Sequence, residues 1–226
     1  MDIVRRDTGA QPGDILEIIE AYRNKRKFIK LIRQTFGSYA DRQLIYSAYD
    51  YHSGLFSGIN RKSGGSYVNS HLIPVAVIMI KIIGSNDPDD VVASIGHDSI
   101  EDIKYVTPEL FSKMFTADSA YMVQGVTKPE LGERNKKSVE YSEETVRVIR
   151  SHGAKCVVLK NDADRLHNML TLWGTQQEKK HKIWETERFY LPLGNEFGLK
   201  SFELRRAIKY QRNLLPINDS DCGHFE

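Results

Sequence analysis

The stretch Ser94–Ile103, SIGHDSIEDI, places one imidazole and three carboxylates directly after an apolar segment. That segment predicts a buried helix, because it consists almost entirely of apolar residues: Val91, Val92, Ala93 and Ile95. Charged side chains resist burial unless they are paired or bind a metal ion. The stretch therefore predicts either a solvated helix end or a metal site, and its polar members are His97, Asp98, Glu101 and Asp102.

Helical spacing brings these polar side chains onto one face. Glu101 follows His97 by four residues and Asp98 by three, and residues at those separations are neighbours on an α-helix. His97 and Asp98 can then reach one ion, with Glu101 and Asp102 poised one turn further along. Taken alone, the pattern is more typical of a frayed, solvated C-terminal helix end than of a metal site.

Two other stretches favour the metal site. His71 stands at the start of the preceding predicted helix, and Asp164 lies in NDADRLHNMLTL, four residues before Asn168. Each has an ordinary explanation by itself, as a helix cap or as a surface charge on an amphipathic helix. Together with His97 and Asp98, however, they offer two imidazoles and two carboxylates. That set suits one divalent transition ion with open water positions, such as manganese, iron or zinc.

The remainder of the chain predicts an all-α fold. Apolar residues recur at three- and four-residue steps, and no segment shows the alternation of a strand. Asp14, Asp87 and Thr107 are placed to cap helices, and Gly153 is placed to end one. We expect a loop over 57–66. The expected helices cover 14–36, 40–54, the residues after His71 to about 83, segments beginning at 88 and 108, and then 117–127, 137–152, 156–173, 179–190 and 195–211.

Composition sets the broad class of the protein. The chain has 226 residues and a formal net charge of +2, with basic and acidic residues interspersed. We therefore expect no nucleic-acid partner and no membrane partner. The two cysteines, Cys156 and Cys222, have no CxxC spacing, and the N-terminus has no signal-peptide pattern. We expect a cytoplasmic protein, and the sequence holds no signal for an oligomeric state.

Several motifs, in the same order, resemble those of the HD-domain hydrolases of the RelA/SpoT family. Besides His71, the resemblance rests on HDSIED, DADRLHNM and RKSGGSYVNSH, and on the longer segments VTPELFSKMFTADSAYMVQGVTK and ETERFYLPLGNEFGL. It covers roughly residues 40–209. The resemblance implies an HD-domain helical bundle with a single mononuclear metal site. We expect an N-terminal helical segment at 1–39, the HD hydrolase domain at 40–211 and a disordered tail at 212–226.

The resemblance also implies roles for individual residues. One divalent ion, Mn²⁺, would be held by His71, His97, Asp98 and Asp164. Glu101 and Asp102 match the acidic pair that activates the attacking water. The residues that match or adjoin the family's substrate contacts are Arg61, which packs against the base, Lys62 and Ser63 beside it, and Asn168 and Thr171 in the nucleoside pocket.

The chain departs from the family pattern at several positions. One extra residue lies between Tyr67 and His71, compared with the family's YxxH. Gly96 replaces the usual leucine before HD, and we expect a looser turn there. Asn161 stands three places before Asp164, where the family has a basic residue, and Lys160 is one step away. These departures leave the implied ligands in place and alter the expected substrate shell. Leu72 and Leu170 likewise replace the family's proline and arginine.

The leading prediction is metal-dependent hydrolysis of the 3′-diphosphate of a guanosine or adenosine alarmone such as ppGpp, with release of pyrophosphate. The substrate partner is then a small nucleotide. Because the chain leaves no room for the family's synthetase domain, we expect a stand-alone small alarmone hydrolase. Two alternatives stay open at this point. One is another HD-domain reaction, such as removal of the NADPH 2′-phosphate or a nucleotide phosphohydrolase activity, and the other is a nucleotide-binding regulatory module.

Overall fold

The structure is a computed structural model that describes residues 7–62, 64–130 and 138–215. Within these residues the regular structure is helical, no strand is present, and one isolated bridge joins Asn60 to Ser66. The predicted all-α fold is confirmed. The chain divides into two compact units. We call Gly13–Thr127 the N-terminal unit, and Met1–Pro12 with Lys128–Glu226 the C-terminal unit.

Several helices of the N-terminal unit begin at a residue whose side chain caps them. Side-chain oxygens accept first-turn backbone N–H groups at Asn24, Ser38, Asp87, Thr107 and Thr116. Prolines occupy the first helical turn after Asp87 and after Thr107, as predicted. The elements are α1 (Pro12–Tyr22), α2 (Lys25–Thr35), α3 (Tyr39–Leu55), η1 (Val68–Leu72), α4 (Ile73–Ile78), η2 (Met79–Ile83), α5 (Pro88–Gly96), α6 (Ser99–Asp102), α7 (Pro108–Met114) and α8 (Ala117–Val126).

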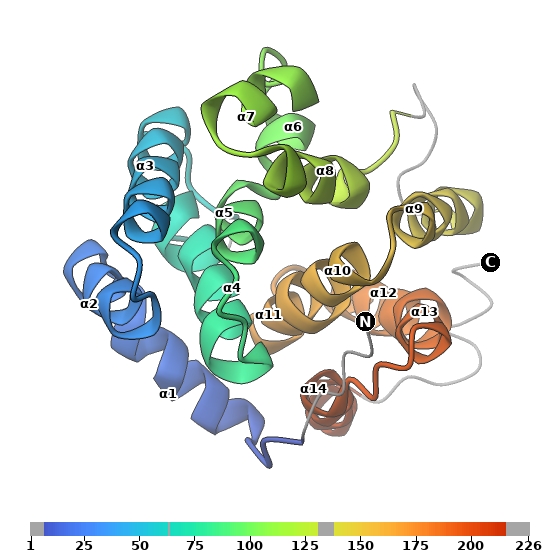
Figure 1. The fold of residues 1–226 in the computed structure, drawn as a ribbon. Helices are drawn as coiled ribbons and strands as arrows, with labels where there is room; N and C mark the ends of the chain where they lie inside the picture. The colour runs from blue at the N-terminus through green and yellow to red at the C-terminus, as the bar shows by residue number, and fades with distance from the viewer. Residues whose placement is uncertain (1–6, 63, 131–137, 216–226) are drawn as a thin grey trace. The chain divides into compact units, whose positions relative to one another are not determined.

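Helix α5 lies at the centre of this unit, where it packs against α3, α4 and α8 (Figure 1). All of its residues from Val91 to Gly96 are buried. The elements η1, α4 and η2 follow one another without a break and form a second, largely buried helix that also packs against α5. His71 lies in the first turns of that helix, and His97 lies directly after α5.

The turn after α5 is tightly packed, so the expected loosening at Gly96 is wrong. A Cβ atom on Gly96 would lie 2.5 Å from Cε2 of Phe111, 2.6 Å from its Cζ, and 3.0 Å from Nε2 of His52. The Phe111 ring on α7 therefore occupies the space that a larger side chain would need. Glycine at this position allows α7 to lie directly against the end of α5.

We expect Gly96→Ala to lower the free energy of unfolding by about 1–3 kcal/mol, because the added methyl group overpacks a filled site. Gly54→Ala is the matched control, since Gly54 lies in α3 and a Cβ there would meet nothing within 4 Å. Urea denaturation of both variants checks the prediction. A Gly96→Ala variant as stable as the Gly54→Ala control would contradict it.

His52 is a buried imidazole beside this turn. Its Nδ1 lies 2.7 Å from the carbonyl oxygen of Ala48 and must donate to it, because a carbonyl can only accept. Its Nε2 is buried and has no hydrogen-bond partner in the described part of the chain. The rings of Tyr51, Phe111 and Phe115 surround it. Burial lowers the pKa of His52 to about 4.

This pKa predicts loss of stability in mild acid. The unfolded chain takes up a proton on His52 below pH 6.5, whereas the folded chain does so only near pH 4, so stability falls as the pH drops through that window. The full difference between the pKa of His52 in the unfolded and in the folded chain corresponds to roughly 3 kcal/mol of unfolding free energy. We expect His52→Gln to lose less stability than the unsubstituted protein between pH 7 and pH 5. His152→Gln is the control, because the half-buried His152 also bonds the carbonyl four residues earlier. Equal pH dependence in His52→Gln and the unsubstituted protein would contradict this account.

The C-terminal unit contains a long buried helix formed by α10, η3 and α11. Residues 156–167 of this helix are all buried, although several are polar: Lys160, Asn161, Asp162, Asp164, Arg165 and His167. The η3 segment packs against α13 and α14. The elements are α9 (Val139–His152), α10 (Ala154–Val157), η3 (Val158–Arg165), α11 (Leu166–Leu170), α12 (Gln176–Glu185), η4 (Thr186–Tyr190), α13 (Leu191–Glu196) and α14 (Phe202–Leu214).

Several predicted helix boundaries are wrong, and three of the differences are large. The helix expected over 14–36 is two helices, because the Asn24 side chain accepts the Lys27 N–H and starts α2. The helix expected after His71 begins earlier, at Val68. The helix expected over 195–211 is interrupted between α13 and α14, where Gly198 and Ser201 have positive φ angles of 72° and 43°. The predicted domain limits stay predictions, and of the predicted tail, 216–226 lies outside the described residues.

Candidate metal centre

His71 is held by a helical segment with a widened turn. The η1 element is π-helical, and the backbone N–H of Ile73 bonds to the carbonyl oxygen of Val68, five residues earlier. A π-turn takes in one more residue than an α-turn. The extra residue noted between Tyr67 and His71 falls in this segment, and His71 is buried there. Asn161, Lys160 and Asp164 all lie in η3, which is also π-helical.

His97 and Asp98 lie in the turn between α5 and α6, not within one continuous helix as predicted. Nδ1 of His97 lies 2.8 Å from the carbonyl oxygen of Ser94 and donates to it, which directs Nε2 to the opposite side of the ring. A backbone bond from the Asp102 N–H to the Asp98 carbonyl, 2.9 Å long, joins the turn to α6.

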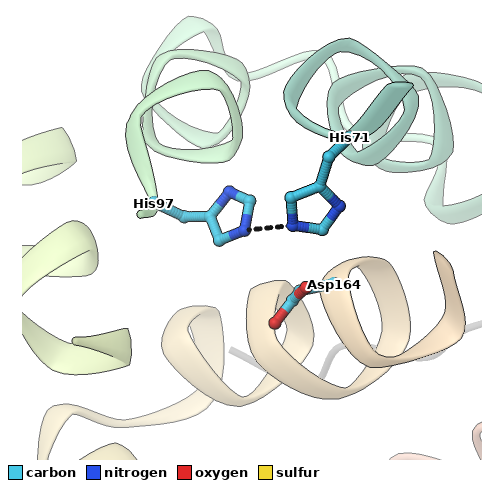
Figure 2. A group of neighbouring side chains, drawn as sticks. All are labelled: His71, His97 and Asp164. Carbon is cyan, nitrogen blue, oxygen red and sulfur yellow. Dashed lines mark hydrogen bonds between the residues drawn. The ribbon is translucent and has the colours of Figure 1, made fainter. Parts of the chain in front are cut away.

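Three donor atoms of the N-terminal unit converge on one point. Nε2 of His71 and Nε2 of His97 are 3.2 Å apart, as the dashed line in Figure 2 marks. Oδ2 of Asp98 lies 3.2 Å from each of them. We call these atoms the donor triangle. Two ligands at right angles on an ion with bonds of about 2.0–2.3 Å are about 2.8–3.3 Å apart, so the triangle fits one face of a divalent ion's coordination shell.

The charges of these groups also suit a cation. Burial lowers the pKa of His71 to about 4, so its imidazole is neutral at pH 7. For Asp98, burial acts to raise the pKa, but His97 and His71 lower it more, and the net pKa is well below its ordinary value. The triangle thus combines a neutral imidazole with a carboxylate. Neutral imidazole and carboxylate are the forms that bind metal ions.

Asp164 lies on η3 in the C-terminal unit (Figure 2). Its own unit supplies two partners: Nζ of Lys160 lies 2.8 Å from Oδ2, and Nδ2 of Asn168 donates to Oδ1 at 2.6 Å. Because the histidines belong to the other unit, we treat the joining of Asp164 to them as a proposal.

A buried ionic network fixes the helix that carries Asp164. Nη1 of Arg165 lies 2.8 Å from Oε2 of Glu185, and its guanidinium lies 3.7 Å over the Tyr190 ring. Lys182 adds a second cation at 3.2 Å from the same oxygen. Burial acts to raise the pKa of Glu185, but Arg165 and Lys182 lower it far below its ordinary value. Such a network holds η3 to α12 and η4, since removing one partner would leave a buried charge.

The acidic pair predicted to act on water lies on α6. Glu101 is half-buried and Asp102 is exposed, so both are less enclosed than the donor triangle. Asp102 is close enough to Tyr67 to contribute to its raised pKa, after burial and Asp98. The pair therefore sits in the same neighbourhood as Asp98. Its role in catalysis stays a prediction.

The predicted substrate contacts are in different settings. Arg61 is half-buried, with its guanidinium 5.8 Å over the Tyr67 ring, whereas Lys62 is exposed. Ser63 lies outside the described residues. In the C-terminal unit, Asn168 bonds to Asp164, and the Thr171 hydroxyl donates to the carbonyl oxygen of His167 at 2.8 Å. Their part in binding a nucleotide stays a prediction.

Sequence reasoning missed the role of Tyr67, although its motif was quoted. Its hydroxyl donates to Oδ2 of Asp98 at 2.7 Å. Burial raises the pKa of Tyr67, and Asp98 raises it further, so the hydroxyl stays protonated and remains a donor. The sequence signal was the tyrosine four positions before the first histidine, but the contact joins residues 31 positions apart.

Known proteins resemble this chain over most of its length. A family model described as HD domain matches residues 48–200. The Haemophilus influenzae protein named guanosine-3′,5′-bis(diphosphate) 3′-pyrophosphohydrolase is 34% identical over 155 residues, which are 68% of this chain and 22% of that protein. An Aquifex aeolicus protein of the same name is 30% identical over 160 residues, which are 70% of this chain and 22% of that protein. A Myxococcus xanthus protein named GTP pyrophosphokinase is 32% identical over 167 residues, which are 70% of this chain and 21% of that protein.

The chain spans about a fifth of the length of these curated relatives. The matched region contains the donor triangle and the acidic pair on α6. None of the helices in the described ranges is long and apolar enough to cross a membrane.

Proposed function

Because the chain belongs to the HD-domain family, we propose that it hydrolyses the 3′-diphosphate of a guanosine or adenosine alarmone such as ppGpp and releases pyrophosphate. The observation that carries the proposal is the donor triangle of His71, His97 and Asp98, with 3.2 Å edges. Relatives named as 3′-pyrophosphohydrolases support the reaction and the substrate class.

The proposed ion is Mn²⁺, held by the donor triangle and by Asp164. The set contains no thiolate, and a mixture of imidazole and carboxylate suits a hard-to-borderline divalent ion. A bound divalent ion supplies a nucleophile at neutral pH, by lowering the pKa of a coordinated water from about 16 towards 7. The proposed compartment is the cytoplasm, where free cysteines stay reduced.

The protein's own residues then perform the proton transfers and hold the substrate. Glu101 and Asp102 orient the attacking water and accept its proton. The water oxygen forms a bond to the phosphorus that is attached to the 3′-oxygen. The bond between that phosphorus and the 3′-oxygen breaks, so pyrophosphate leaves, and the 3′-oxygen takes a proton to become a hydroxyl. Arg61 and Lys62 offset the negative charge of the substrate. Ser63, Asn168 and Thr171 complete the proposed nucleotide contacts.

A substrate panel tests this function. Metal-stripped protein is incubated with ppGpp, pppGpp, ppApp or NADPH, with and without Mn²⁺, and the products are separated. We expect pyrophosphate from at least one alarmone, only when Mn²⁺ is present. Orthophosphate from NADPH alone would instead indicate a 2′-phosphatase. Binding of an alarmone without turnover would indicate a regulatory module.

A further inference from the structure

Tyr67 is held in place by two ring contacts and one backbone hydrogen bond. Its ring stacks on Phe56 with centroids 5.0 Å apart and planes 8° apart, and it meets the His71 ring edge-on at 5.6 Å. Its backbone N–H bonds to the carbonyl oxygen of Ile59 at 3.0 Å. The hydroxyl therefore projects from a rigid ring in a direction that the surrounding side chains determine.

The Tyr67 hydroxyl forms a hydrogen bond with one of the three atoms of the donor triangle. It donates to Oδ2 of Asp98 at 2.7 Å, and that same oxygen lies 3.2 Å from Nε2 of His71 and of His97. The terminal torsion of an aspartate is soft, so nothing intrinsic to Asp98 decides which oxygen faces the histidines. A fixed donor on one oxygen decides it.

We propose that Tyr67 is a positioning residue, which presets the Asp98 carboxylate as a ligand before the ion binds. The inference rests on the proposed function, because it takes the donor triangle as the ion's site. Partners that orient metal ligands contribute to affinity without touching the ion, and losing one typically costs about 10- to 100-fold in metal affinity. Tyr67 fits this description, since its contact is to the ligand Asp98.

The test uses Mn²⁺ alone, titrated calorimetrically into the metal-stripped protein. Tyr67→Phe removes only the hydroxyl and keeps the ring that stacks on Phe56. We expect its dissociation constant for Mn²⁺ to rise about 10- to 100-fold, while its unfolding temperature without metal stays close to that of the unsubstituted protein. Tyr46→Phe is the matched control, because the buried Tyr46 hydroxyl has no hydrogen-bond partner in the described ranges. We expect its Mn²⁺ affinity to be unchanged.

The outcomes separate this inference from the proposed function. If Tyr67→Phe binds Mn²⁺ as tightly as Tyr46→Phe does, while the unsubstituted protein binds Mn²⁺ and hydrolyses an alarmone, the inference is wrong and the function stands. Equal weakening in both tyrosine variants would also overturn it, because the hydroxyl of Tyr46 does not touch the triangle. If the unsubstituted protein binds no Mn²⁺, both proposals are overturned.

Discussion

Removal of His97 is expected to abolish Mn²⁺ binding and alarmone hydrolysis together. Its Nε2 is one corner of the donor triangle, and its Nδ1 is already committed to the Ser94 carbonyl. Loss of a ligand should exceed the 10- to 100-fold cost of losing a ligand's outer partner, so we expect both quantities to fall by more than about 100-fold in His97→Gln. Glutamine keeps most of the volume of this buried side chain and so limits the loss of packing.

Calorimetric titration with Mn²⁺ and a pyrophosphate-release assay, on the same preparation, measure the two quantities. His152→Gln is the control, because His152 lies at the end of α9, outside the donor triangle. We expect it to behave like the unsubstituted protein. Retention of tight Mn²⁺ binding in His97→Gln would mean that the ion is held elsewhere.

The double variant Glu101→Gln/Asp102→Asn is expected to separate catalysis from metal binding. These carboxylates lie on α6, beyond the donor triangle, so the variant should fold and bind Mn²⁺ normally. Positioned acid–base groups contribute about 10²- to 10⁴-fold in rate, and we expect turnover to fall at least about a hundredfold. The measurement is kcat with saturating Mn²⁺ and ppGpp.

A matched acidic pair on α9 provides the control for charge loss, namely Glu143→Gln/Glu144→Gln. We expect its turnover to be unchanged. Near-normal turnover in the α6 variant would mean that Glu101 and Asp102 are solvated charges at a helix end and have no role in catalysis. The groups that accept the proton would then have to lie elsewhere.

The sequence was sufficient to predict the all-α fold but not the local geometry of the proposed site. Periodicity and caps such as Asp87 predicted the helices, because both depend on local residues. The widened turn at η1 was not predicted, because a bond from the Ile73 N–H to the Val68 carbonyl five residues earlier leaves no recognisable local pattern in the sequence. Likewise, Gly96 was expected to loosen its turn because the sequence does not show that Phe111 packs against it.

The proposed site also shows where local reasoning fails. His97 and Asp98 were predicted on one helix with Glu101, because the spacing of these residues is helical. The chain instead ends α5 at Gly96, and the Ser94 carbonyl directs the His97 ring. The residues of the donor triangle were named from the sequence, but the distance between His71 and His97 depends on the packing of two helices and is known only from the structure.

Anomalous scattering from a crystal grown with Mn²⁺ would test the central claim most directly. The account predicts one strong manganese peak within bonding distance of Nε2 of His71 and of His97, and of the carboxylates of Asp98 and Asp164. A peak held by other side chains, or no peak beside the two histidines at saturating Mn²⁺, would contradict it.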